Sequence, residues 1–473
     1  MATRSAGEDG GMTVRPTRTQ GERDGASGRG TLLQNLMFAC CVLFGLAMIA
    51  NTQTANDGGW YWYATLFRGG ERLYSGLHLA LQPLFVLETA WFLGLLGKGW
   101  LVSKAPAVLH VVAYCFGLLL LARRSKLSDA GKAVVLGCAF FVSIDFVAYR
   151  FDDYHVLSDC FMVYSLVVLL ILEATREGLR RDCLAAGLGI LSGLSMTTRL
   201  NDGAALLVGV GIAIVFMARS RRLVSLALFS AAAALTVVLV VHLSGDSLHD
   251  WAMNSIFRAA ASKGGTGSVL AYPMELPRNT LSFLRDRQNF EFTGYLLTAT
   301  VTWGALVLPY LRSRLRADLW KLAAGVALIL VPLHHFYRRG GFEDQHLIID
   351  LSAVGVFVLY GLGIAVFVRA VLSRSTAGWI QEWNGREILL VIPLGQMASG
   401  SMSSAGEHIG LYGPIAMMVL LLPIAFSGWF NREWRRGFVL AIAFILAAHC
   451  AAFKYRTPYL WHTYRSRAMF VDR

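Results

Sequence analysis

The sequence has few charged residues. Asp, Glu, Lys and Arg make up only 15% of its 473 residues, against about a quarter in a typical soluble domain. Hydrophobic residues make up 55%. One soluble core could not bury so much apolar side-chain surface, which excludes a soluble globular protein. The scarcity of charge therefore predicts an integral membrane protein.

The signatures of nucleotide-dependent chemistry are also absent from the sequence. It contains no P-loop, no G-x-G-x-x-G, and neither H-E-x-x-H nor G-x-S-x-G. The stretches between apolar runs are too short to hold a nucleotide-binding domain. Chemistry with ATP or a nucleotide sugar inside the cell is therefore not expected, and the substrate should arrive already activated, from the membrane or from outside.

Cysteine spacing of the metal-binding or redox type is missing as well. The seven cysteines lie in or at the ends of apolar runs, where we expect buried thiols. No cofactor is required by this pattern.

Apolar runs account for most of the chain. Each is close to the length of about 20 residues that an α-helix needs to cross a bilayer, and the alternating strands of a barrel are not seen. The sequence therefore predicts an all-α integral membrane protein with about 13 transmembrane helices. We expect the spans near residues 31–50, 101–122, 131–148, 158–175, 183–199, 203–217, 223–243, 291–311, 319–336, 346–369, 388–404, 410–427 and 438–453.

The basic residues give these spans an orientation. The net charge of +13 comes from short clusters of Lys and Arg between apolar runs, which is the positive-inside distribution and not a nucleic-acid-binding pattern. Arg123 and Arg124 should be cytoplasmic, which allows only one crossing between Asp57 and Arg123. The apolar run 81–97, which contains Glu88, is therefore expected to form a non-crossing helix in the first outer loop.

This register divides the chain into four segments. Residues 1–30 are expected to be a disordered cytoplasmic tail, because they have almost no apolar content. Residues 31–243 form an N-terminal transmembrane module with acidic outer loops. Residues 244–290 form a long outer loop, of a length typical of a lid or binding segment. Residues 291–473 form a C-terminal transmembrane module and tail.

The first outer loop carries a carboxylate among glycines and aromatics. Asp57 follows the first span in the sequence Asn-Asp-Gly-Gly-Trp, where glycines permit a ligand to approach the backbone and aromatics suit a membrane interface. Asp57 is the strongest candidate for a functional group.

Further polar candidates fall on the same predicted face. Asp152 and Asp153 could bind an acceptor or a divalent cation, Mg²⁺ or Mn²⁺, with His155 nearby, or could pair with Arg150. Arg199 could contact the site or pair with Asp202. Arginine offers a planar fork to phosphate oxygens, although basic side chains at an interface can also reach lipid phosphate without specificity. The candidates for binding an anionic head group are Arg150, Arg199, Lys263, His334, His335, Arg338 and Arg339, and two further outer-face candidates are Glu407 and His408.

In order and spacing, the N-terminal half resembles the GT-C superfamily of integral-membrane glycosyltransferases, which use polyprenyl-phosphate-linked sugars. The likeness covers roughly residues 31–220. The residues that carry it are Asp57-Gly-Gly-Trp, Gln82-Pro83-Leu84, Phe92-Leu-Gly94, the pair Asp152 and Asp153, and Thr198-Arg199 with Gly203. The chain lacks the W-W-D-type motif of oligosaccharyltransferases and the Asp-Glu pair of protein O-mannosyltransferases, and is more like the bacterial members that modify lipids or polysaccharides.

The resemblance implies an enzyme of the inner membrane. Asp57 would be the general base at the periplasmic or extracellular face, Asp152 and Asp153 would help to bind the acceptor or a metal, and basic residues of the C-terminal module would hold the donor phosphate. The acceptor would be a lipid, a glycan or another cell-envelope molecule. Two other interpretations stay open: an O-antigen polymerase or ligase, and a polytopic transporter or flippase.

Overall fold

The computed structural model describes about half of the chain. The described residues are 20–51, 55–79, 81–97, 99, 104–143, 154–175, 178–217, 221–258, 386–401 and 412–425. Every regular element within these ranges is helical, which confirms the predicted all-α class for this part of the chain. The predicted spans near 291–311, 319–336, 346–369 and 438–453 lie outside the described residues.

The helices follow the predicted order of spans. They are α1 (Gln20–Asn51), α2 (Ala55–Arg68), α3 (Leu84–Leu96), α5 (Ala105–Arg124), α6 (Asp129–Ser143), α7 (Tyr154–Ala174), α8 (Leu179–Met196), α9 (Leu200–Met217), α10 (Arg222–Leu243), α11 (Leu248–Trp251), a π-helix (Ala252–Arg258), a 3-10 turn (Glu387–Leu390), α17 (Val391–Ser401) and α18 (Tyr412–Ala425).

Four of the described helices are long and apolar enough to cross a membrane: α5, α7, α9 and α10. Shorter apolar helical stretches occur at Thr31–Ala47 in α1, in α3 and at Ala416–Ala425 in α18. The chain is therefore a multi-pass membrane protein, while the predicted total of about 13 spans stays a prediction.

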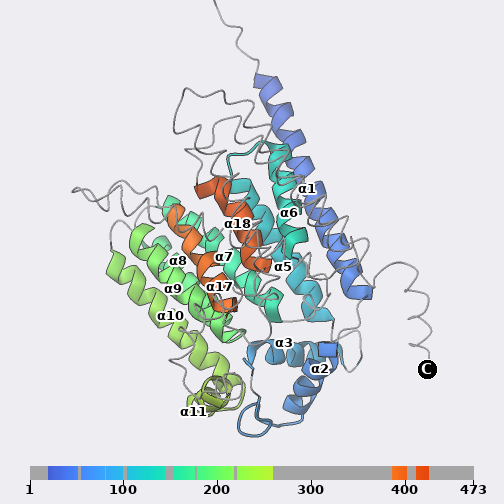
Figure 1. Cartoon of the computed structure of the whole chain (residues 1–473), viewed down its shortest axis with the longest axis vertical. Coiled ribbons are helices and arrows are strands. Elements are labelled where there is room, and N and C mark those ends of the chain that lie inside the picture. Colours follow the sequence, from blue (N-terminus) through green and yellow to red (C-terminus); the bar gives the residue numbers. More distant parts are fainter. Residues whose placement is uncertain are drawn as a thin grey trace, which may run out of the picture.

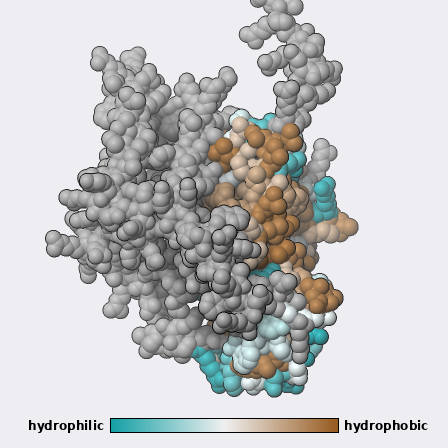
Figure 2. Space-filling view, turned by 90° about the vertical axis from the view of Figure 1, so that its right-hand side faces the viewer, coloured by the Kyte–Doolittle hydropathy of each residue, from teal (hydrophilic) through white to brown (hydrophobic). Residues whose placement is uncertain are grey.

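The long helices pack side by side into one bundle (Figure 1). Helix α5 packs on α7, α8 lies between α7, α9 and α10, and α1 packs on α6. The C-terminal helices α17 and α18 pack on α9 and α6, so the two ends of the described sequence share one apolar core. Figure 2 shows hydrophobic residues over the middle of the described surface and hydrophilic residues at its lower end.

Helices α2 and α3 lie together at one end of this bundle, which we call the α2–α3 end. In Figure 1 the helix α3 lies across the bundle and not along it. Its 13 residues span about 20 Å at 1.5 Å per residue, which is shorter than the hydrocarbon core of a bilayer. The helix begins after Pro83 and ends at Gly97, which has a φ of 82°. This placement agrees with the predicted non-crossing helix.

A second, smaller core holds the α2–α3 end together. Trp60, Tyr74, Phe85 and Trp251 belong to its buried residues. The Arg68 guanidinium donates a hydrogen bond of 3.1 Å to the Ala90 carbonyl and lies where a side chain at Gly94 would be, so the glycine lets α2 and α3 approach.

Two boundaries differ from the predicted ones. Helix α1 begins at Gln20, before the predicted first span at residue 31, so residues 20–30 are helical and not a disordered tail. Residues 55–68 form a helix where the sequence predicted a glycine-containing loop. Aromatic side chains of α2 pack into the second core, and this tertiary packing outweighs the poor helix propensity of Gly58 and Gly59.

Basic residues mark the opposite end of the bundle. Arg123 at the end of α5 donates to Asn35 at 2.8 Å, Arg221 pairs with Asp182 at 3.2 Å, and Arg386 pairs with Glu173 at 3.0 Å. These are ends of helices that the positive-inside pattern predicts to share one side of the membrane.

The contact between α8 and α10 depends on glycine. A Cβ on Gly189 would overlap the Phe229 carbonyl, and a Cβ on Gly193 would lie 2.7 Å from the Ala233 carbonyl oxygen. The two backbones therefore touch, as small residues allow in membrane helices.

Replacing Gly189 by alanine should force α8 and α10 apart. We expect Gly189→Ala to destabilise the protein by about 1–3 kcal/mol, as overpacking does elsewhere. Thermal unfolding of the purified protein in detergent measures the effect. Gly187→Ala is the matched control, because a Cβ at Gly187 meets nothing within 4 Å and alanine favours the helix. Equal unfolding temperatures for the two variants would contradict the close contact.

Candidate functional site

An aromatic contact joins helix α2 to the start of α7. The ring of Trp60 meets the ring of Tyr154 edge to face at 5.5 Å and that of Phe85 at 5.3 Å. Tyr154 in turn stacks on His155 at 4.3 Å. Such aromatic pairs add to the free energy gained by burial alone. The contact therefore fixes α2 against α7 at the α2–α3 end.

This contact joins the helix that contains Asp57 to the helix that follows Asp152 and Asp153 in the sequence. Asp57 is the third residue of α2, in its first turn and three positions before Trp60, so the two positions lie on one face of the helix. Asp152 and Asp153 lie outside the described residues, and so does Arg150, but α7 begins directly after them at Tyr154. His155, the described member of this group, is buried at 3% exposure.

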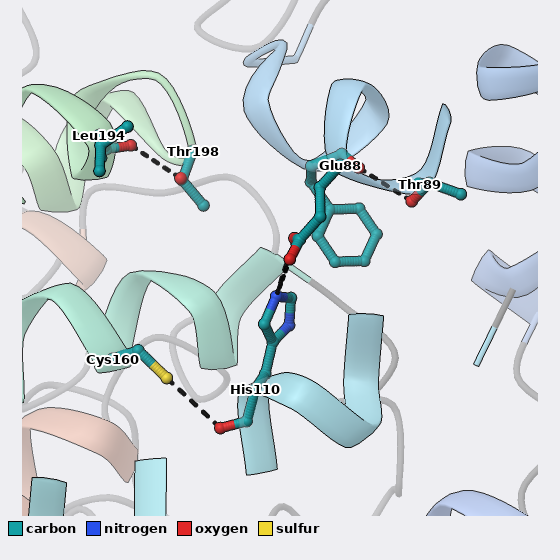
Figure 3. A network of polar contacts seen from close by, with 7 residues as sticks. Glu88, Thr89, His110, Cys160, Leu194 and Thr198 are labelled. Carbon is teal, nitrogen blue, oxygen red and sulfur yellow. Dashed lines mark hydrogen bonds and ion pairs between the residues drawn. The ribbon is translucent and has the colours of Figure 1, made fainter. Parts of the chain in front are cut away.

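A buried pair between α3 and α5 lies beside the aromatic contact (Figure 3). His110 Nε2 is 2.9 and 2.8 Å from the two carboxylate oxygens of Glu88. Cys160 donates a hydrogen bond of 3.5 Å to the His110 carbonyl, which links α5 to α7. Phe85 also packs against the His110 ring at 5.9 Å. Sequence reasoning noticed Glu88 but missed His110, since one histidine in an apolar run forms no pattern.

The turn between α8 and α9 holds a second buried pair. Arg199 Nη1 is 2.7 Å from Asp202 Oδ2, and the two side chains are 10% and 6% exposed. Of the two alternatives left open by the sequence, the structure shows the pair. Burial, the largest effect, would lower the pKa of Arg199, but Asp202, Tyr154 and Asp159 raise it above its ordinary value.

The same turn explains two residues of the family-like motif. Gly203 lies against the backbone of Met196 with no space for a Cβ, so the turn itself requires glycine. The Thr197 carbonyl accepts a hydrogen bond of 2.9 Å from Leu84 N at the start of α3. Thr198 donates to the Leu194 carbonyl at 2.8 Å, as Figure 3 shows.

Asp246, which follows α10, binds the loop between α2 and α3. Its carboxylate accepts hydrogen bonds from Tyr74 N at 2.9 Å, from Ser75 N at 2.9 Å and from Ser75 Oγ at 2.8 Å. Burial and the nearby Asp246 charge raise the pKa of Tyr74 well above its ordinary value. Trp251 Nε1 donates to Gln82 Oε1 at 2.9 Å nearby. These bonds tie the segment after α10 to the loop between α2 and α3.

The remaining predicted residues lie outside the described part of the chain. They are Lys263, His334, His335, Arg338, Arg339, Glu407 and His408. Within the described ranges, no group of three or more His, Cys, Asp or Glu side chains could hold a metal ion. The predicted metal ligands Asp152 and Asp153 lie outside these ranges.

No family model matches the sequence, and no curated protein matches it. Among solved structures, the chain is similar to an oligosaccharyltransferase from Archaeoglobus fulgidus, determined with Zn and sulfate. The identity is 16% and the TM-score 0.39, over 89% of this chain and 53% of the archaeal one. It is also similar to ArnT from Cupriavidus metallidurans bound to undecaprenyl phosphate. Here the identity is 13% and the TM-score 0.36, over 88% of this chain and 78% of ArnT.

The chain spans about half the length of the archaeal enzyme.

Removing the charge of Asp246 should loosen the α2–α3 end. We expect Asp246→Asn to destabilise the protein by about 1–3 kcal/mol, because the amide has one acceptor oxygen in place of two and the N–H of Tyr74 or Ser75 loses its acceptor. Thermal unfolding and cleavage by added protease in the loop 69–79 measure this. Asp250→Asn is the control, since the Asp250 carboxylate contacts only the exposed Ser247 hydroxyl at 2.7 Å. The proposed tie is wrong if both variants resist the protease equally.

Proposed function

We propose that the protein is a membrane glycosyltransferase that moves a sugar from a polyprenyl-phosphate donor to a lipid, glycan or other cell-envelope acceptor. The observation that carries the proposal is the contact between Trp60 and Tyr154 at 5.5 Å. It places the helix of Asp57 beside the start of α7, which directly follows Asp152 and Asp153. Helix α2 and the start of α7, about a hundred positions apart in the sequence, therefore meet at one end of the bundle, which supports a shared site for Asp57 and the acidic pair that precedes α7 in the sequence.

In this proposal Asp57 is the general base. The acceptor oxygen attacks the anomeric carbon, the bond from that carbon to the phosphate oxygen breaks, and polyprenyl phosphate leaves. The acceptor hydroxyl therefore needs only to lose its proton during the attack. A carboxylate within hydrogen-bond reach of that hydroxyl does this in a single displacement with inversion. Asp152 and Asp153 would hold the acceptor, or a divalent cation, in place beside His155.

Cations must stabilise the leaving phosphate. The proposed donor-phosphate ligands are Arg150, Lys263, His334, His335, Arg338 and Arg339. Arg199 is a weaker candidate than the sequence suggested, because its guanidinium is already paired with Asp202 at 2.7 Å. Fixed positive groups at the developing charge lower the barrier most in a site that excludes water.

The proposed location follows from the charge pattern. Arg123, Arg221 and Arg386 lie at the end of the bundle opposite to α2 and α3, which supports a cytoplasmic position for that end. The α2–α3 end would then face the periplasm or the exterior of an inner membrane. A lipid-linked donor can reach it from the bilayer.

Loss of the proposed base should greatly slow sugar transfer. We expect Asp57→Asn to lower kcat by about 10²–10⁴, the contribution typical of a general base. The assay follows sugar transfer from polyprenyl-phosphate sugars to lipid and glycan acceptors by the purified protein. Glu71→Gln is the control, as Glu71 is an exposed carboxylate close after α2.

Two results would contradict the proposal. Transfer by Asp57→Asn at the wild-type rate would remove Asp57 from the catalytic role. Movement of the lipid-linked sugar across vesicle membranes by the wild-type protein, with no glycosidic bond formed, would show a transporter or flippase.

A further inference from the structure

A junction of several helices lies around Ser158 and Asp202, one helical turn after the start of α7. Ser158 Oγ donates to Asp202 Oδ2 at 3.4 Å, which joins α7 to α9. Asp202 is also bound to Arg199 of the α8–α9 turn at 2.7 Å. Gln396 Nε2 of α17 donates to the Asp202 carbonyl at 3.3 Å. Asp202 is thus the residue at which α7, α9, α17 and the turn between α8 and α9 are connected.

Helix α18 reaches the same place. The Asp159 carboxylate lies where a side chain at Gly413 would be, near the first turn of α18. A helix N-terminus is a favourable neighbour for a negative charge. Asp159 and Asp202 are each 4% exposed, and Arg199 interacts electrostatically with both. The junction therefore joins the N-terminal helices to both described C-terminal helices.

Helical periodicity connects this junction to the candidate site. Ser158 lies four residues after Tyr154, so the two share one face of α7. Tyr154 in turn contacts Trp60, on the helix that carries Asp57. A displacement of α7 at Ser158 would thus be passed to α2 through two side chains.

We propose that Arg199 and Asp202 are positioning residues, which seat the start of α7 through Ser158 and Tyr154 and thereby fix α2 with Asp57. The inference rests on the proposed function for the role of Asp57. It differs from the sequence-based expectation, in which Arg199 would bind the donor phosphate directly. The pair acts on the reaction through Tyr154 and Trp60 without touching the substrate.

The first test separates positioning from phosphate binding by kinetics. Asp202→Asn and Arg199→Gln should each lower kcat about tenfold and leave KM for the donor within about twofold, since about 1.4 kcal/mol corresponds to a tenfold change. Arg199→Lys keeps the charge and should recover part of kcat. Arg221→Gln is the control, because it breaks the exposed pair with Asp182 at the opposite end and should change neither constant.

The second test needs no enzymatic activity. Ala64 is fully buried on α2, one turn after Trp60, so a cysteine there should react slowly with a membrane-impermeant maleimide. In the Ala64→Cys protein, adding Asp202→Asn should raise the labelling rate at least fivefold, and adding Arg221→Gln should not. The parent protein without Ala64→Cys gives the background from its native cysteines.

The outcomes distinguish the two proposals. A rise in KM for the donor with an unchanged labelling rate would assign Arg199 to the phosphate and overturn the positioning role. Unchanged labelling together with unchanged kcat would overturn it as well. Faster labelling in a protein whose wild-type form transfers no sugar would support the junction while refuting the proposed function.

Discussion

Polar groups buried in an apolar bundle must find partners, and this requirement shapes the α2–α3 end. An ionised side chain removed from water costs several kcal/mol unless an opposite charge or hydrogen bonds compensate it. Here Glu88 is paired with His110, Arg199 with Asp202, and Asp246 with two backbone N–H groups and a hydroxyl. The Glu88 and Asp246 pairings each join separate segments, so satisfying these groups also determines how those segments are arranged.

The arrangement gives a non-crossing helix a fixed place. Helix α3 is held by its Leu84 N–H on the α8–α9 turn, by Glu88 on α5 and by Arg68 of α2. A short apolar helix at an interface would otherwise be free to slide along the membrane surface. These three contacts hold α3 in place against α2. The first turn of α2 contains Asp57, the strongest functional candidate in the sequence.

The large features of this architecture could be predicted because they follow from charge and hydropathy. Counting the basic clusters around Arg123 predicted a helix in the first outer loop that does not cross, since each misplaced crossing would put arginines on the wrong side, and the structure has the short helix α3 there. Helix α2 was missed because Gly58 and Gly59 suggest a loop, whereas the aromatic side chains that stabilise the helix find their partners in distant parts of the chain. Local propensity carries no information about such contacts.

The polar pairs set a sharper limit on prediction. Arg199 and Asp202 are three residues apart, so their pairing was one of two foreseeable outcomes. Glu88 and His110 lie in different apolar runs, and only the packing of α3 against α5 brings them together. For Asp57 the sequence identified the segment, and the structure shows that the helix containing it contacts α7 through Trp60 and Tyr154. The donor-binding candidates from Lys263 onward depend on parts of the chain that the described residues do not include.

The contacts of Gln396 and Gly413 bear on how the protein is assembled in the membrane. Both residues belong to the last fifth of the chain, yet Gln396 donates to the Asp202 backbone carbonyl on α9 and Gly413 lies against the Asp159 carboxylate on α7. Helices α7 and α9 enter the bilayer much earlier during synthesis. Until α17 and α18 arrive, Asp159 and Asp202 lack neighbours that the finished protein provides. Completion of the surroundings of Asp159 and Asp202 is therefore coupled to insertion of the C-terminal helices. A chain truncated before α17 would leave these polar groups exposed to lipid, where cellular quality control can recognise them.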